Sequence, residues 1–201
     1  MNGTDRLNAQ MAFLCEVDKL KSILRATRLH DNSRFENSAE HSWHVALYAM
    51  VLADHRPIGS DPFRVIKMLL VHDIVEIDAG DAPIHGDFNK EEMARKEQIA
   101  ADRLFSLLPV DQAREFRALW DEFEAAQSPD ARFAKALDRI PSPLANMANG
   151  GGSWTEYEVS ESDLDRRVGV PIQAGAPELW KWLKTKIRQW FREHIPTDSV
   201  R

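Results

Sequence analysis

Apolar residues along most of the chain recur at steps of three and four, the spacing of one face of an α-helix. No stretch alternates between apolar and polar positions in the way that is typical of a half-buried strand. The sequence therefore predicts an all-α fold, a helical bundle of about six or seven helices. The expected helices cover about residues 7–25, 38–52, 62–79, 90–107, 111–123, 129–144 and 176–195.

Three of the expected helices have clear start signals. Asp61-Pro62 and Ser128-Pro129 each place a capping side chain before a proline, which favours the first helical position. Ser38 is the expected cap of the second helix. The apolar spacing of the first helix continues to Leu24, so we expect this helix to stop between Arg25 and Arg28.

A run of glycines within Asn149–Ser153 interrupts the helical pattern and is typical of a linker. The following residues, 154–175, are polar and weakly periodic. At 201 residues the chain is long enough for one well-packed domain. We expect a single domain over residues 1–201, with a core at about 7–148 and a C-terminal extension whose amphipathic helix covers about 176–195.

The third expected helix carries ionisable side chains where apolar residues would be expected. His72, Asp73 and Glu76 interrupt it, and Gly80 ends it and turns Asp81 back toward the same place. Burying these groups together would be costly unless something strongly charged compensated them. A divalent metal ion is the simplest compensator, so the segment predicts a metal site.

Two residues in other helices extend this hypothesis. His41 begins an apolar stripe, and Asp138 lies beside another stripe just before Pro141. We expect Arg139 to point away from Asp138, so that a distant cation or a metal must hold this carboxylate. His44 is a weaker ligand candidate, and His85 is expected on the surface.

Charge and cysteine usage narrow the classes of partner. The net charge of −6 and the absence of a basic run argue against binding of a nucleic-acid polymer. The single Cys15 excludes an internal disulfide and suits a reducing cytoplasm. No apolar run is long enough to span a bilayer, so we expect a cytoplasmic protein without a membrane partner.

His41, the doublet His72-Asp73 and Asp138 resemble the H…HD…D pattern of the HD-domain metal-dependent phosphohydrolases. The residues around them are similar to the group of bacterial 5′-deoxynucleotidases and human-type HD-domain-containing nucleotidases. The resemblance covers about residues 7–148 and rests on Glu40-His41-Ser42, Val71–Glu76, Gly80-Asp81 and Ala136-Leu137-Asp138.

The resemblance implies that His41, His72, Asp73 and Asp138 hold one divalent metal ion. Two imidazoles and two carboxylates form a mixed nitrogen and oxygen donor set, which suits cobalt, manganese, zinc, nickel or iron. The identity of the ion stays open among these.

The resemblance also implies a reaction, the hydrolysis of (deoxy)nucleoside 5′-monophosphates to nucleoside and phosphate. Glu76 would orient the attacking water, Asp81 would protonate the leaving sugar oxygen, and Arg25 would grip the phosphate. In the deoxynucleotidases a tryptophan that helps to exclude ribonucleotides follows this arginine. Here Ala26 follows, so the choice between deoxyribose and ribose stays open.

Alternative functions would use the same metal ligands. One is an HD-type hydrolase of another phosphate ester or a diester, and another is a non-catalytic nucleotide or metal sensor. A sensor has no need of an acid–base pair such as Glu76 and Asp81. A di-iron oxygenase would need further histidine ligands, and His44 and His85 are the nearby histidines that remain.

The aromatic C-terminal helix, together with the resemblance, predicts a homodimer.

Overall fold

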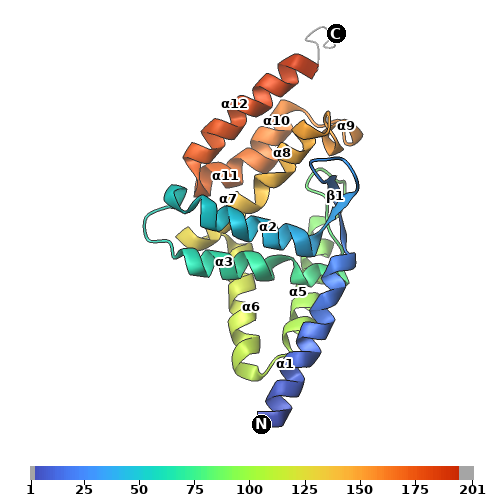
Figure 1. Cartoon of the computed structure of the whole chain (residues 1–201), viewed down its shortest axis with the longest axis vertical. Helices are drawn as coiled ribbons and strands as arrows, with labels where there is room; N and C mark the ends of the chain where they lie inside the picture. Colours follow the sequence, from blue (N-terminus) through green and yellow to red (C-terminus); the bar gives the residue numbers. More distant parts are fainter. Residues whose placement is uncertain (1–2, 195–201) are drawn as a thin grey trace.

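Helices form most of the regular structure in the computed structural model of the chain, which describes residues 3–194 (Figure 1). The longer helices are α1 (Gly3–Val17), α2 (Ser38–Val51), α3 (Pro62–Val71), α5 (Lys90–Phe105), α6 (Val110–Ala125), α7 (Pro129–Arg139), α8 (Pro141–Ala148) and α12 (Pro177–His194). Shorter helical segments are η1 (Asp18–Ser22), η2 (Ala53–His55), η3 (His72–Val75), α4 (Glu76–Ala79), α9 (Ser153–Glu156), α10 (Glu161–Leu164), η4 (Asp165–Gly169) and α11 (Val170–Gly175). The all-α class is confirmed, and short helices are added to the expected ones.

Two of the three expected capping residues are confirmed, and the cap of α2 lies one residue earlier than expected. Asp61 caps α3 by accepting a hydrogen bond from the Phe63 amide at 2.9 Å, and Ser128 caps α7. Ser38 was the wrong cap for α2. Asn37 takes that position, because its side chain accepts from the Glu40 amide at 3.0 Å while Glu40 accepts from the Asn37 amide at 2.8 Å.

The expected end of the first helix is wrong. The helix α1 ends at Val17, and after η1 the chain forms strand β1 (Leu24–Arg28), which pairs antiparallel with β2 (Phe35–Asn37). Leu24, the apolar position that extended the helical spacing, is 61% exposed, so it does not belong to a buried helix face. The two strands form a short ribbon beside the start of α2 (Figure 1).

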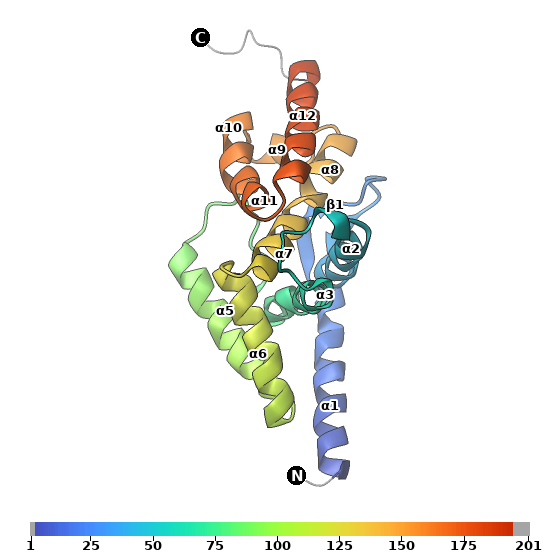
Figure 2. The same cartoon turned by 90° about the vertical axis from the view of Figure 1, so that its left-hand side faces the viewer.

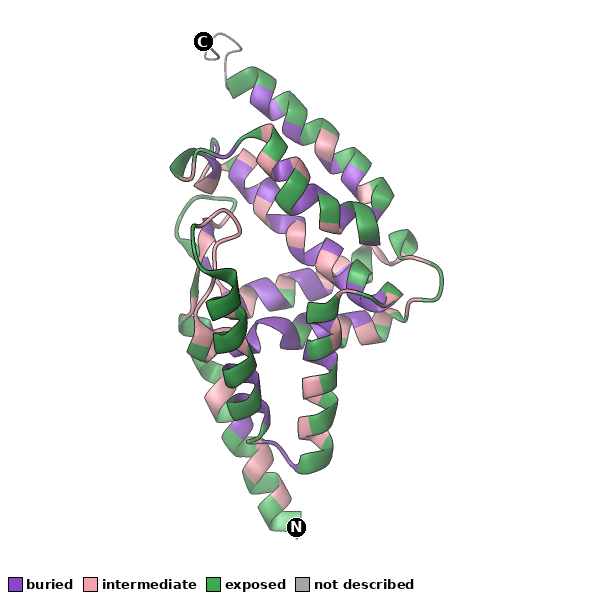
Figure 3. Ribbon diagram, turned by 180° about the vertical axis from the view of Figure 1, so that it is seen from behind, coloured by how far each residue is buried: buried purple, intermediate pink, exposed green. Residues whose placement is uncertain are grey.

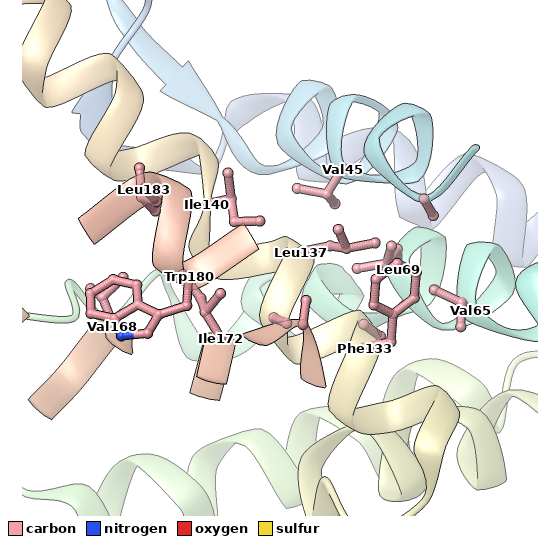
Figure 4. Close-up of a cluster of buried hydrophobic side chains, with 14 of the residues drawn as sticks. Val45, Val65, Leu69, Phe133, Leu137, Ile140, Val168, Ile172, Trp180 and Leu183 are labelled. Atoms are coloured by element: carbon pink, nitrogen blue, oxygen red, sulfur yellow. The ribbon is translucent and has the colours of Figure 1, made fainter. Parts of the chain in front are cut away.

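The main core forms around α7. Side chains from α2, α3, α11 and α12 converge on Phe133 and Leu137 of this helix and on Ile140, which directly follows it (Figure 4). Figure 3 shows the buried residues concentrated in these middle elements. Trp180, Leu183, Ile187, Trp190 and Phe191 are all buried along α12, so the predicted apolar stripe is confirmed as a core face.

A second apolar cluster joins α1, η3, α5 and α6. In two views at right angles, α5 and α6 lie side by side and extend toward the same end of the molecule as α1 (Figures 1 and 2). The segment η3 borders both this cluster and the main core. All four of its residues, His72–Val75, are buried.

The C-terminal segments share the main core. Residues 153–175, which the sequence showed as mostly polar and weakly periodic, form α9, α10, η4 and α11, and Trp154, Leu164, Val168 and Ile172 are buried against the other helices. This shared core agrees with one domain, although the domain limits stay a prediction, and the expected helix end at residue 195 lies outside the described residues. Within residues 3–194, no helix is both long enough and apolar enough to cross a membrane.

The contact between α11 and α7 depends on Gly175. A Cβ atom added there would come within 1.9 Å of the Arg132 carbonyl oxygen and 2.9 Å of the Ala136 Cβ. We expect Gly175→Ala to lower the free energy of unfolding by about 1–3 kcal/mol, because the two helices must separate. Urea unfolding measures the change, and Gly3→Ala, where nothing lies within 4 Å, is the matched control. Equal stability of the two variants would contradict this packing.

Candidate functional site

Segments far apart in the sequence place polar side chains at one buried position. Strand β1 contributes Arg25 and the middle of β2 contributes Glu36, while the other side chains come from the first turn of α2, from η3 and from the end of α7. The side chains that meet are Arg25, Glu36, His41, His72, Asp73 and Asp138.

Three of these residues form a buried group that could hold a metal ion. His41, His72 and Asp73 each offer a ligand atom, and these atoms all lie within 4.8 Å of one another. The Nδ1 atom of His72 lies 2.8 Å from the Leu69 carbonyl oxygen and donates its hydrogen there, so Nε2 is the ring nitrogen that a metal ion would bind. That Nε2 is buried 2.9 Å from Asp73 Oδ1 and has no hydrogen-bond partner among residues 3–194. Two imidazoles beside carboxylates therefore fit a divalent ion.

Asp138 lies beside this group. Its Oδ1 atom is 3.0 Å from His41 Nε2 and 3.5 Å from His72 Nε2, so the structure brings together all four predicted ligands. The expectation that Arg139 points away is wrong, because Arg139 Nε lies 3.7 Å from Asp138 Oδ2. Arg139 is the last residue of α7, where the regular helix ends, and its side chain turns back toward its neighbour.

The pKa values of His72 and Asp73 reflect the negative charge of the carboxylates around them. Burial alone would lower the pKa of His72, but the carboxylates of Asp73 and Asp138 raise it to about 10. Burial opposes the ionised form of Asp73, yet His72 and Arg25 hold the pKa of Asp73 below its usual range. A bound cation would take over the compensating role of the imidazolium.

Glu76 and Asp81 follow this group in the chain and lie at its edge. Glu76, at the start of α4, accepts a hydrogen bond from the Ser38 hydroxyl at 2.5 Å. Burial and the Asp73 carboxylate raise the pKa of Glu76 well above its usual value. Gly80 has a φ of +79°, which favours glycine, and it turns the chain so that Asp81 reaches Arg25. Burial also raises the pKa of Asp81, although Arg25 opposes this change.

Arg25 was expected at the end of the first helix, but it lies on β1. Its Nη1 atom lies 3.3 Å from Asp73 Oδ2 and 3.6 Å from Asp81 Oδ1. Its side chain is only 12% exposed. Burial alone would lower the pKa of Arg25, but the surrounding carboxylates raise it. A guanidinium held in this way offers a fixed fork for an oxyanion.

A cavity of about 170 Å³ opens beside Arg25, Asp73 and Glu76. The cavity is also lined by Lys135, Arg139 and Tyr157, for which the sequence indicated no function. His85 also lines it and is only partly exposed, so its expected place on the surface is wrong. Burial and the nearby Arg167 lower the pKa of His85 to about 4, which leaves this imidazole neutral at physiological pH.

Glu36, Lys135 and Tyr157 had no recognisable signal in the sequence. Glu36 lies in a segment expected to be a loop, and Lys135 lies on the helix that carries Asp138. Lys135 Nζ is 2.9 Å from Glu124 Oε1 and 4.0 Å from the ring centre of Phe123, which itself packs against His72. Only the folded chain shows these contacts.

His44 is not among the residues that line the cavity, and its ring packs against Trp43 and Tyr48.

Comparison with known proteins identifies the family of this chain. The sequence model of a family described as HD domain matches residues 17–180. The chain belongs to the HD domain family. The human 5′-deoxynucleotidase HDDC2 is 35% identical over 160 residues, which cover 79% of this chain and 71% of that protein. The 5′-deoxynucleotidase yfbR of Photorhabdus temperata is 25% identical over 79% of this chain and 83% of its own.

A solved structure supports the same assignment. It belongs to a protein from Magnetospirillum magnetotacticum MS-1, described as a predicted metal-dependent phosphohydrolase, which is 47% identical to this chain. The TM-score is 0.88, and the match covers 94% of this chain and 96% of the other. The resemblance to HD-domain proteins is therefore confirmed, and the family match continues past the glycine run to residue 180.

The ligand assignment leads to a direct test. We expect Asp73→Ala to lose most of its bound cobalt on dialysis, because Asp73 supplies one of the buried ligand atoms. Elemental analysis after loading and dialysis measures the metal content. Asp78→Ala is the matched control, since Asp78 lies on α4 and pairs with Arg103 on the surface. Full metal content in Asp73→Ala would refute the assignment.

Proposed function

We propose that this HD-domain protein is a metal-dependent phosphomonoesterase that hydrolyses nucleoside 5′-monophosphates to nucleoside and phosphate. The observation that carries the proposal is the buried group of His41, His72 and Asp73 next to the guanidinium of Arg25, at the wall of a cavity. Relatives that are 5′-deoxynucleotidases support the class of substrate. Phosphate monoesters hydrolyse very slowly without a catalyst, so charge stabilisation at phosphorus is the main requirement.

In this proposal His41, His72, Asp73 and Asp138 hold one divalent ion. When bound, such an ion supplies Lewis-acid polarisation of the phosphoryl group and makes water a stronger nucleophile. Cobalt, manganese, zinc, nickel and iron all suit the donor set. The ion also balances the carboxylates that otherwise keep His72 protonated.

The acid–base steps belong to Glu76 and Asp81. Glu76 holds the attacking water and takes its proton, and its raised pKa makes this carboxylate a stronger base than an exposed glutamate. In this proposal Asp81 carries a proton and gives it to the leaving 5′-oxygen, and burial, which raises the pKa of Asp81, favours the protonated form. Arg25 binds the phosphate oxygens from the side that faces Asp73 and Asp81.

The sugar and the base enter the remainder of the cavity. Ala26 and Thr27 follow Arg25 along β1, and both line the cavity. The small side chain of Ala26 leaves room next to the phosphate position for a 2′-hydroxyl, so we expect both deoxyribonucleotides and ribonucleotides to be accepted. The cavity wall contains acidic and basic side chains but no extended basic groove, which supports a small substrate over a nucleic-acid polymer.

We also propose that two copies of the chain form a homodimer. Large apolar side chains are exposed on the outer helices, for example Leu7, Met11 and Leu14 on α1 and Trp43 on α2. Light scattering at micromolar concentration tests this proposal, and the mass of a single chain would refute it.

The activity is tested by phosphate release from the metal-free protein reloaded with cobalt or manganese. The substrates are deoxyribonucleoside and ribonucleoside 5′-monophosphates, a nucleoside 3′-monophosphate and a phosphodiester. We expect both kinds of 5′-monophosphate to be hydrolysed only when metal is present. Turnover of the diester alone would replace the proposal with a phosphodiesterase, and absence of turnover with every substrate would favour a sensor.

The same assay tests the role of Glu76. We expect Glu76→Gln to retain metal and fold, since the amide oxygen can still accept from Ser38, but to lose about 10²–10⁴-fold in kcat. Asp78→Asn, two residues further along α4, is the control. Undiminished turnover per bound metal ion in Glu76→Gln would refute the proton transfer.

A further inference from the structure

Glu36 is a buried carboxylate that the proposed reaction does not use. It lies in the middle of β2 and is 7% exposed. Its Oε2 atom is 3.3 Å from Arg25 Nε and also 3.3 Å from His41 Nδ1. One oxygen atom therefore faces both the residue proposed to bind phosphate and a residue proposed to bind metal.

Both nitrogen atoms need an acceptor. Arg25 Nε and His41 Nδ1 are buried, and neither has a hydrogen-bond partner within the described residues. A buried donor without a partner is costly, because it has lost its hydrogen bond to water and gained none in the protein. Glu36 Oε2 lies at ion-pair distance from both, so a small rotation of this carboxylate would complete both bonds.

The two contacts have different chemical consequences. A carboxylate at Nδ1 keeps the hydrogen of His41 on that atom, which leaves the Nε2 lone pair for a metal ion and increases its basicity. A carboxylate at Nε of Arg25 fixes the plane of the guanidinium, so that Nη1 remains directed toward Asp73 and Asp81. The ribbon makes this possible, since it pairs the strand of Arg25 with the strand of Glu36.

We propose that Glu36 is a positioning residue that orients the metal ligand His41 and the phosphate-binding Arg25 at the same time. The part that concerns phosphate rests on the proposed function, whereas the part that concerns His41 requires only that the site binds metal. A purely structural counter-ion for Arg25 would support the fold but would leave the affinity for metal unchanged.

The first test is Glu36→Gln, which keeps the size of the side chain and an acceptor oxygen but removes the charge. We expect its affinity for cobalt, measured by competition with a chelator, to fall about 10- to 100-fold. Glu40→Gln is the matched control. Glutamine also completes the capping box at this position, and Glu40 contacts the exposed Arg34 and not the site. We expect its cobalt affinity to stay within about twofold of the original protein.

The second test measures inorganic phosphate binding to the cobalt-saturated proteins by calorimetry. We expect weaker binding in Glu36→Gln, and little further loss when this change is added to Arg25→Ala, because Glu36 acts on phosphate through Arg25. Fully additive losses would overturn that part of the proposal. Neither measurement depends on nucleotide turnover, so failure of the proposed activity remains distinguishable from failure of the role of Glu36.

A third measurement needs no substitution, which protects the proposal if Glu36→Gln does not fold. Nitrogen-15 spectra of the histidine rings in the zinc-loaded protein report which ring nitrogen carries hydrogen. We expect hydrogen on Nδ1 of His41. Hydrogen on Nε2, or cobalt affinity in Glu36→Gln equal to that of Glu40→Gln, would overturn the proposal.

Discussion

The site depends on the electrostatic cost of burying carboxylates close together. Glu36, Asp73, Glu76, Asp81 and Asp138 converge around Arg25, a deeply buried permanent cation. Burial and the Asp73 carboxylate raise the pKa of Glu76, and the carboxylates of Asp73 and Asp138 raise the pKa of His72. The fold tolerates this arrangement because many apolar contacts around α7 stabilise the helices that carry it.

This excess of negative charge explains why the site has two kinds of support. Helical segments carry the two histidines, Asp73 and Asp138, and packing against the core holds them rigidly. The ribbon carries Arg25 and Glu36, whose charges adjust the electrostatic balance. Rigidly held ligands suit the binding of a metal cation, and the charged strand pair beside them suits the binding of an anionic phosphate.

Helix periodicity and local chemistry predicted much of this structure. The apolar stripes of α2, α3, α7 and α12 follow from residue spacing, because their buried faces are continuous. His72 and Asp73 could be recognised because charged groups in an apolar segment need compensation. The ribbon could not be predicted in this way. Its two strands are short, and Leu24 continues the apolar spacing of the preceding helix although it is exposed.

The residues missed in the site were missed for a related reason. Glu36 and Lys135 have ordinary surroundings in the sequence, and their importance arises from partners on other elements, such as Arg25 for Glu36 and Glu124 for Lys135. Arg139 was misplaced because a regular helix was assumed to continue through it, whereas α7 ends there. Side-chain direction at a helix end depends on tertiary contacts that spacing does not encode.

The hydrogen bond between the His72 ring and the Leu69 carbonyl has a consequence for how this centre can change in evolution. The acceptor belongs to the main chain, so no substitution at position 69 removes it as long as the backbone keeps its course. The tautomer of His72 is thus protected from point mutation of its partner. The corresponding contact of His41 is with a side chain and can be lost by one substitution at position 36. Of the two imidazoles, His41 is therefore the one that can be tuned.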